Sequence, residues 1–245
     1  MKDLTFYDDT PFQYGYSSPA EIIKYINPIL KQLIKDNTGK IVADIGCGCG
    51  RNLYYAKDFS AKLFGVDLSA RSIDFAKQLV DSDKLELIEG NNLSIPIAND
   101  SIDLVISDGV CHHTGNTYKA ISECVRILRP EGRLYLAVYK KYRYYPFLYF
   151  VIGGFFRILN KYKIGKLILD NIFIPLHYIG YKLFRKGTLL FSETRNIFFD
   201  YFITPIATFH SKKNINNWVD SLNAELLDYY STNGNCHIFI ITKNE

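Results

Sequence analysis

Short apolar runs alternate with segments of helical periodicity over the first 140 residues of the chain. The runs with strand character are residues 40–46, 61–69, 84–90, 101–109 and 132–140. The segments compatible with helices are residues 51–58, 69–80 and 116–130, the last of which is expected to end before Pro130. Strands that alternate with helices in this way predict a doubly wound, mostly parallel sheet.

Residues that favour helix initiation mark one of these helices and a further helix before the first strand. Near the N-terminus, Ser18 suits the N-cap, Pro19 the first turn and Glu21 the capping-box position. Apolar residues at helical spacing follow them, so residues 1–36 are expected to form an N-terminal helical cap. Ser69 is the N-cap candidate of the helix that follows the second strand.

The alternation of strands and helices ends near residue 140. Residues 140–204 are rich in Tyr, Phe, Ile and Lys, and we expect a helical insertion that forms a lid or an acceptor pocket. Beyond it, AELLDYY and CHIFIITK flank a turn with Asn233 and Gly234, which predicts a hairpin. The 245 residues, 48% of them hydrophobic, can form one large domain, residues 1–245, that includes the insertion.

The composition favours a cytoplasmic protein. The first residues, MKDLTFYDD, carry acids where a secretory signal needs an apolar run, so no export peptide is expected. Five cysteines without paired spacing fit a reducing compartment better than a disulfide framework. The longest nearly uncharged run, YYPFLYFVIGGFF at residues 144–156, is shorter than the roughly 20 residues of a membrane-spanning helix.

The stretch IVADIGCGCGRN at residues 41–52 places three alternating glycines between a strand and a helix. Gly46, Gly48 and Gly50 let backbone N–H groups approach a ligand closely and direct the helix N-terminus at it. Asp67 ends the second strand about 20 residues later, where a carboxylate can accept hydrogen bonds from both ribose hydroxyls. A nucleoside-containing cofactor is therefore expected.

Two residues disfavour a nicotinamide dinucleotide as this cofactor. The dinucleotide fingerprint needs a glycine at position 51, which is Arg51 here. Asp44 comes two residues before the first glycine, where its charge would repel phosphates. It suits a cationic ligand instead.

Four stretches in order resemble the motif series of the class I S-adenosylmethionine-dependent methyltransferases. They are VADIGCGCGRN, FGVDLS, IEGNNLSIPIANDSIDLVISDGVCHHT and ILRPEGRLYLAVY, within residues 40–140. The resemblance implies a seven-stranded sheet whose last strand is antiparallel, with S-adenosylmethionine as the cofactor. Its methionine part would lie over the glycine loop, and Asp67 would hold its ribose.

The resemblance also implies which residues contact the cofactor. The expected cofactor-binding residues are Asp44, Gly46, Cys47, Gly48, Gly50, Asp67, Leu68, Asn91, Asn92, Leu93, Asp108 and Gly109. The family often has an acid near the adenine after a glycine, whereas Gly90 is followed here by Asn91, whose amide can accept from the adenine amino group. Cys47 and Cys49 lack a second C-x-C or C-x-x-C pair, so we expect small loop fillers and no metal site.

The segment DGVCHHTG at residues 108–115 follows the fourth strand and is expected at the carboxyl end of the sheet, where ligands of such folds bind. His112 and His113 are the catalytic candidates, since an imidazole can take a proton near neutral pH. His113 is more similar to the family's recurrent position in this loop. The alternative is that one imidazole caps the next helix and the other packs beneath the cofactor.

The insertion carries most of the basic charge. Residues 140–186 hold ten Lys and Arg against Asp170 alone, a net charge of +9 that leaves −5 for the rest of a +4 chain. Such a surface can bind acidic small molecules, RNA phosphates or anionic lipid headgroups. It can also be a solvated face on helices that cover the active site.

The expected function is methyl transfer to oxygen or nitrogen of a small or lipid-linked acceptor, with peripheral contact at the inner face of a membrane. One alternative is a tRNA-modifying methyltransferase, because the two histidines followed by ISECVRILRPEG also resemble wobble-uridine enzymes. Nucleic acid is the less favoured acceptor. The other alternative is a non-catalytic module that binds the cofactor or a partner protein.

Overall fold

The computed structural model describes residues 6–7, 19–185 and 190–245, which form two compact units. The sheet unit contains the described residues of 18–141 and 206–245. The helical unit contains those of 142–205 together with residues 6–7. Ser18, the expected N-cap, lies outside the described residues.

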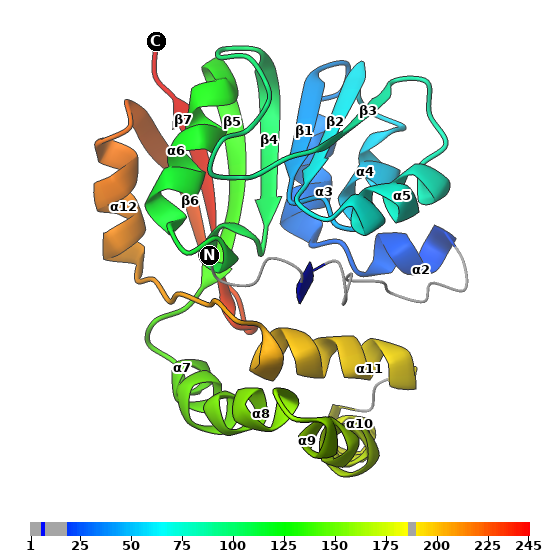
Figure 1. The fold of residues 1–245 in the computed structure, drawn as a ribbon. Coiled ribbons are helices and arrows are strands. Elements are labelled where there is room, and N and C mark those ends of the chain that lie inside the picture. The colour runs from blue at the N-terminus through cyan, green and yellow to red at the C-terminus, as the bar shows by residue number, and fades with distance from the viewer. Residues whose placement is uncertain (1–5, 8–18, 186–189) are drawn as a thin grey trace. The chain divides into compact units, whose positions relative to one another are not determined.

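The sheet unit is built on a seven-stranded sheet (Figure 1). Its strands are β1 (Ile41–Ile45), β2 (Lys62–Asp67), β3 (Leu85–Glu89), β4 (Ile102–Asp108), β5 (Leu128–Tyr139), β6 (Ala224–Ser231) and β7 (Cys236–Lys243). The order is β3-β2-β1-β4-β5-β7-β6, with β1 to β5 parallel and β7 antiparallel to both of its neighbours. The predicted parallel sheet, its terminal hairpin and its antiparallel last strand are confirmed.

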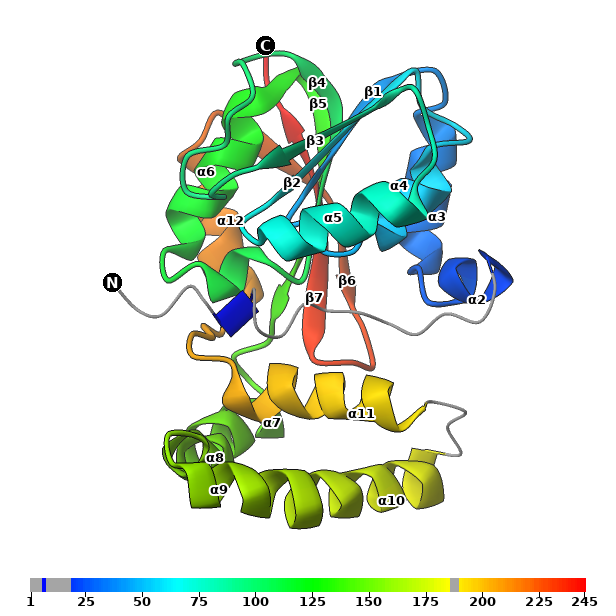
Figure 2. The same ribbon diagram turned by 45° about the vertical axis from the view of Figure 1, so that its right-hand side comes forward.

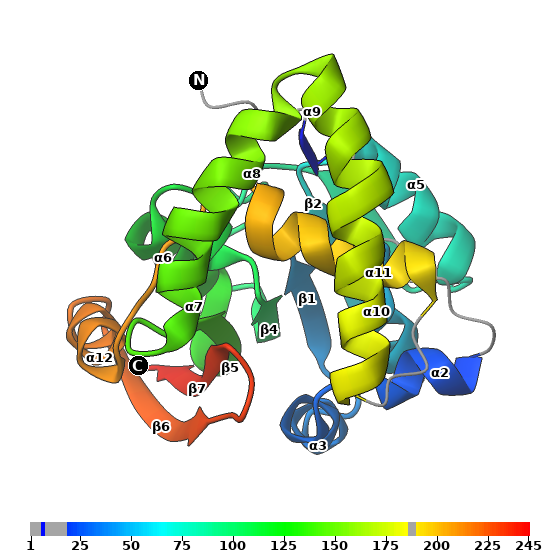
Figure 3. The ribbon, with the colours of Figure 1, turned by 90° about the horizontal axis from the view of Figure 1, so that it is seen from below.

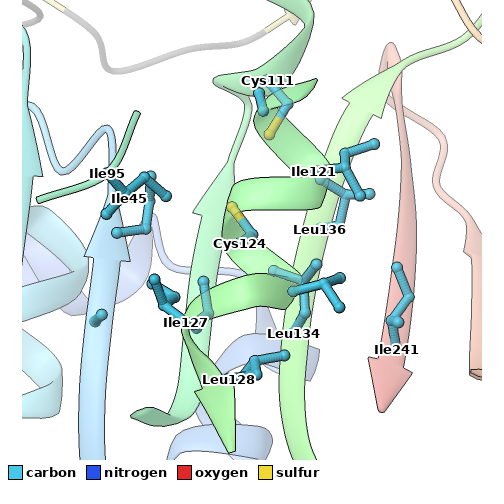
Figure 4. Packing of buried hydrophobic residues seen from close by; sticks show 14 of the residues in the cluster. Ile45, Ile95, Cys111, Ile121, Cys124, Ile127, Leu128, Leu134, Leu136 and Ile241 are labelled. Atoms are coloured by element: carbon cyan, nitrogen blue, oxygen red, sulfur yellow. The ribbon is translucent and has the colours of Figure 1, made fainter. Parts of the chain in front are cut away.

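Helices cover both faces of this sheet (Figure 1, Figure 2). One face carries α3 (Pro28–Asp36), α4 (Arg51–Ala56) and α5 (Ala70–Leu79), and the other carries α6 (Thr117–Ile127) and α12 (Lys212–Asp220). Figure 4 shows Ile121 and Cys124 of α6 among Leu134, Leu136 and Ile241 of the strands. Because both faces are covered, the central strands are apolar without alternation, as the sequence runs suggested.

The helix N-terminal to β1 is interrupted, which the periodicity did not predict. It divides into α2 (Pro19–Lys24) and α3, with Asn27 in an extended conformation at φ −58° and ψ 133°. Pro28 disfavours a helical conformation in the residue before it, and its missing N–H suits the first position of a new helix. The Asn27 side chain caps that helix by accepting from Ile29 N at 2.9 Å. The predicted cap of α5 is confirmed, since Ser69 accepts from Ser72 N at 3.1 Å.

The helical unit consists of helical segments that each contain a π-helical turn. They are α7 (Tyr144–Phe147), η2 (Leu148–Ile152) and α8 (Gly153–Asn160); α9 (Lys163–Ile168), η3 (Leu169–Phe173) and α10 (Ile174–Arg185); and α11 (Phe191–Phe198) with η4 (Phe199–Ile203). Their shared core is Phe156, Leu169, Ile174, Phe198, Phe199 and Ile203. The expected helical insertion before the last two strands is thus confirmed. Within the described ranges, no helix is both long and apolar enough to cross a membrane.

Candidate functional site

The loop after β1 is shaped by glycines with positive φ. Gly46 has φ +77°, and a Cβ there would come within 2.4 Å of the Val110 side chain. Gly48 has φ +52°, and the space where its Cβ would sit contains no atom within 4 Å. Gly50, at φ +85°, begins α4. The loop therefore leaves its backbone open to a ligand at Gly48, at the carboxyl end of the sheet.

Asp67 holds this loop against the end of β2. Its Oδ2 accepts from Gly48 N at 2.8 Å, and its Oδ1 accepts from Ser69 N at 3.0 Å. Asp67 thus joins the glycine loop to the strand end where a ribose was expected. Leu68, also expected to contact the cofactor, is half-buried beside it.

Asp44 is a buried carboxylate whose oxygens lack a hydrogen-bond donor among the described residues. Its side chain is 1% exposed, and neither oxygen has a hydrogen-bond partner within the described part of the chain. Burial is the main reason that the pKa of Asp44 rises to about 7; Asp108 raises it further, whereas Arg51 and the nearby Asn52 side chain lower it. Such a group is poised to accept a cation, because an isolated buried anion is costly.

Arg51 and Asp108 form an ion pair that the sequence did not predict. Arg51 Nη2 lies 2.9 Å from Asp108 Oδ2, which joins the start of α4 to the end of β4. Asn52 was also missed; it is 5% exposed, and its Oδ1 has no partner among the described residues. Gly109 follows Asp108 with φ +84°, and a Cβ there would meet no atom within 4 Å. Its open side resembles that of Gly48.

The loop after β3 contains the asparagines expected near an adenine. Asn91 is exposed, and its Oδ1 accepts from Leu93 N at 2.8 Å. Asn92 is 8% exposed, and its Oδ1 has no partner within the described ranges. Leu93 is half-buried and packs against the core on the α6 face. Of the two amides, that of Asn92 is therefore the one whose buried oxygen lacks a donor.

The two thiols of the glycine loop are not activated. Cys47 is 6% exposed and belongs to the core on the α3 and α4 face. Burial raises the pKa of Cys47 well above its ordinary value, and burial also raises the pKa of Cys49 to about 12. Both thiols stay protonated at neutral pH and are poor nucleophiles.

His112 and His113 lie in a single 3₁₀ turn, η1 (Cys111–His113), but in different environments. His112 is fully buried, its ring centroid is 3.8 Å from that of Tyr139, and neither ring nitrogen has a partner in the described ranges. Burial, and then the neighbouring His113 and His210, hold the pKa of His112 well below its ordinary value. His112 is thus a neutral core residue.

His113 is only partly buried, and its Nδ1 lies 2.6 Å from Ile206 O. A carbonyl oxygen can only accept, so Nδ1 carries the proton and the lone pair of the neutral ring is on Nε2. This tautomer is the one that a general base requires at Nε2. The contact with Ile206 O therefore fixes the tautomer in which Nε2 of His113 can accept a proton.

Residues 206–210 hold the histidine turn from the side. Thr208 donates to His112 O from both its backbone N, at 2.9 Å, and its Oγ1, at 3.0 Å. Thr208 Oγ1 is also 2.8 Å from Thr117 Oγ1 and 2.9 Å from His210 Nε2. Sequence reasoning missed this segment, because its residues carry no motif and lie more than 90 positions from the histidines that they support.

Known proteins resemble the chain most clearly around this site. Residues 43–136 match a family model described as a methyltransferase domain. The malonyl-[acyl-carrier protein] O-methyltransferase of Yersinia pestis is 29% identical over 118 residues, covering 48% of this chain and 43% of that protein. The probable tRNA methyltransferase 9B of Mus musculus is 31% identical over 116 residues, 46% of this chain and 25% of that protein. These matches span less than half the length of either relative.

Solved structures share the fold over most of the chain. The magnesium protoporphyrin IX methyltransferase from Synechocystis PCC 6803, solved with bound SAH, has a TM-score of 0.58 and 16% identity over 92% of this chain and 83% of that one. The YcgJ protein from Bacillus subtilis has a TM-score of 0.56 and 15% identity over 88% of this chain and 98% of that one. At these identities the likeness concerns the fold, and it confirms the fold that the motif series implied.

Proposed function

We propose that this chain, whose residues 43–136 match a family model described as a methyltransferase domain, transfers a methyl group from S-adenosylmethionine to oxygen or nitrogen of a small or lipid-linked acceptor. The observation that carries the proposal is the buried carboxylate of Asp44, which has no partner in the described ranges and lies two residues before the glycine loop. A buried anion is retained when a ligand supplies its counter-charge. The ammonium group of the cofactor is such a ligand.

The other loops fit the remaining parts of the cofactor by their chemistry. The open positions at Gly48 and Gly109 allow a ligand to approach the backbone closely. The Asp67 carboxylate at the end of β2 suits ribose hydroxyls. The buried Oδ1 of Asn92 can accept from an adenine amino group, a role that the sequence had favoured for Asn91.

The mechanism is an in-line displacement that the chain assists by alignment and proton removal. S-adenosylmethionine, when bound, would supply a methyl group on a sulfonium to the acceptor's lone pair, with the thioether as the leaving group. His113 takes the proton of the acceptor at Nε2, since its Nδ1–H is directed to Ile206 O. His112 stays neutral in the core and supports the turn. Most of the rate enhancement comes from holding the reactants in line.

The proposal specifies the chemical class of the acceptor and not the individual molecule. Residues 140–204 are proposed to supply the surface that binds it. A relative named as an O-methyltransferase favours oxygen. The second candidate is tRNA, which relatives named as tRNA methyltransferases favour. An RNA surface, however, uses basic and stacking residues among polar ones, whereas the exposed residues of the helical unit are largely aliphatic and phenylalanine. A small or lipid-linked acceptor is therefore preferred.

Calorimetry with the purified full chain tests the cofactor assignment. S-adenosylmethionine should bind, and its affinity should fall as the pH drops below 7, approaching about tenfold per pH unit. The sign follows from Asp44: below its pKa of about 7 the free protein holds a proton there that a cationic ligand must displace. Asp44→Asn should bind more weakly and lose most of this pH dependence.

Two further variants and one further ligand complete the experiment. Asp67→Ala should weaken binding by about 2–3 kcal/mol, because two hydrogen bonds to a carboxylate are removed. Asp58→Asn changes an exposed carboxylate outside the site and should leave the affinity unchanged. Comparable affinity for NAD, or wild-type affinity in both the Asp44 and the Asp67 variants, would contradict the proposal.

A further inference from the structure

Large apolar side chains lie exposed along two helical segments of the helical unit. They are Phe147, Phe150, Val151, Phe155 and Ile158 on residues 144–160, and Ile164, Leu167, Ile172, Leu176, Ile179 and Leu183 on residues 163–185. Their exposed fractions run from 50% for Ile172 to 72% for Ile164. We call this set the outer face. Single exposed apolar residues are ordinary, but a set of this extent marks an interaction surface.

The outer face is separate from the core of the helical unit. Leu176, Ile179 and Leu183 are spaced by three and four residues and so share one side of α10. Ile174, which is fully buried, points into the shared core with Phe156 of α8 and Phe198 of α11. Figure 3 shows α10 crossing in front of α11. These helices thus have one apolar side buried in the core and a second apolar side exposed. A helix that faces only water on its second side is usually polar there.

Basic residues accompany the outer face, with little acidic charge to offset them. Lys161 is exposed between α8 and α9, Lys163 and Lys166 are exposed on α9, and Lys182 is exposed on α10. Residues 143–183 contain six Lys and Arg against one acid, Asp170, so the face is positively charged. That acid already lies 3.3 Å from Arg195 in an ion pair.

We propose that the outer face binds the surface of an anionic lipid membrane. Apolar side chains would enter the boundary between headgroups and acyl chains, while lysines extend their charged ends to the headgroups. The helices would lie in the interface, since none in the described ranges is long and apolar enough to span a bilayer. A second copy of the chain is a poorer occupant, because a symmetric contact would bring the lysines of both copies together.

Vesicle co-sedimentation of the full chain tests this surface without any cofactor. Vesicles of phosphatidylcholine with one quarter phosphatidylglycerol should bind the protein, and vesicles of phosphatidylcholine alone should bind it far less. Binding should weaken when the salt concentration rises from about 0.1 M to about 0.5 M. The Asp44→Asn variant should bind vesicles as wild type does, so a failure of the methyltransferase proposal and a failure of this one give different results.

Three multiple variants separate charge from apolar contact. Lys161→Glu, Lys163→Glu and Lys166→Glu together should reduce partitioning to anionic vesicles on the order of a hundredfold. Leu176→Gln, Ile179→Gln and Leu183→Gln together should reduce it at least about tenfold, because less apolar surface enters the interface. The matched control reverses three exposed lysines of the sheet unit, Lys35→Glu, Lys40→Glu and Lys77→Glu, and should retain most of the binding. Circular dichroism checks that each variant is folded.

Several outcomes would overturn the proposal. Absence of vesicle binding, equal binding to neutral vesicles, or equal loss in the control would each do so. Self-association by light scattering that the Gln variant abolishes, without vesicle binding, would assign the outer face to a second copy. Salt-sensitive tRNA binding that the Glu variant abolishes, again without vesicle binding, would assign it to RNA.

Discussion

At the scale of single residues, the adjacent side chains of His112 and His113 lie in different environments. His112 is fully buried, and burial keeps its ring neutral. His113 is partly buried and has its tautomer set by Ile206 O. The two rings lie 4.2 Å apart and both contact Tyr139, but only the ring of His112 is fully buried. This difference in burial makes a direct mutational comparison informative.

His113→Ala should lower turnover on the order of a hundredfold, because the acceptor of the substrate proton is lost. Cofactor affinity should stay nearly unchanged, because the variant is expected to keep all contacts with the cofactor. His112→Ala should instead lower the free energy of unfolding, since it leaves a cavity beside Tyr139. Single-turnover kinetics, calorimetry and thermal unfolding distinguish these effects. Unchanged turnover in both variants would leave alignment alone as the mechanism, and joint loss of turnover and affinity in His113→Ala would indicate packing against the cofactor.

At the scale of elements, the histidine turn depends on the chain that returns from the helical unit to the sheet. His210 N donates to Tyr139 O at 2.8 Å, and Lys141 N donates to His210 O at 3.0 Å, so this return is tied to the end of β5. Thr208 then holds His112 O from the same segment. Two polar side chains, Thr117 and His210, and the backbone O of His112 meet at the Thr208 hydroxyl, so we infer that it is a positioning group for the turn.

Thr208→Val should therefore lower turnover about tenfold with little change in cofactor affinity, because His113 loses its fixed orientation. It should also lower the free energy of unfolding by about 1–3 kcal/mol, since the polar partners of the hydroxyl are left unsatisfied. Thr242→Val is the matched control: its hydroxyl donates to Gly132 O at 3.3 Å near the start of β5, whereas the Thr208 segment is tied to the end of that strand. That variant should lose stability and keep its turnover. Equal turnover in the two variants would remove the positioning role.

At the scale of the whole molecule, the two units have separate cores. The residues proposed to bind the cofactor and His113 all belong to the sheet unit, whereas the outer face belongs to the helical unit. The helical unit has its own buried aromatic cluster, which includes Phe198. Loss of that cluster is therefore expected to affect acceptor and membrane binding before cofactor binding.

The Phe198 side chain is 2% exposed. Phe198→Ala should therefore lower the free energy of unfolding of the helical unit by about 3–5 kcal/mol. Hydrogen exchange should then accelerate in residues 144–203, while calorimetry should give a cofactor affinity within a few-fold of wild type. Phe239→Ala makes the same change at a fully buried position of the sheet core and should weaken cofactor binding instead. Equal loss of cofactor affinity in the two variants would mean that the units unfold together.

The sequence by itself determined the sheet, the hairpin and the shape of the glycine loop. These depend on local properties: apolar runs between helical segments, turn residues, and glycines where φ is positive. Asp67 was likewise identifiable, because adjacent parallel strands bring their carboxyl ends to one edge. The break at Pro28 could also have been found, since a proline signals it locally; the continuing apolar periodicity concealed it.

Only the tertiary structure decided which polar groups contact each other and which buried polar groups lack a hydrogen-bond partner among the described residues. The pair of Arg51 with Asp108 joins residues 57 positions apart, and that of His113 with Ile206 joins residues 93 apart. Burial of Asp44 depends on every element packed over it, so its raised pKa has no signal in the local sequence. The division of the helical unit into core and outer face has the same origin: its helices are apolar on both sides, and only packing selects the side that is buried.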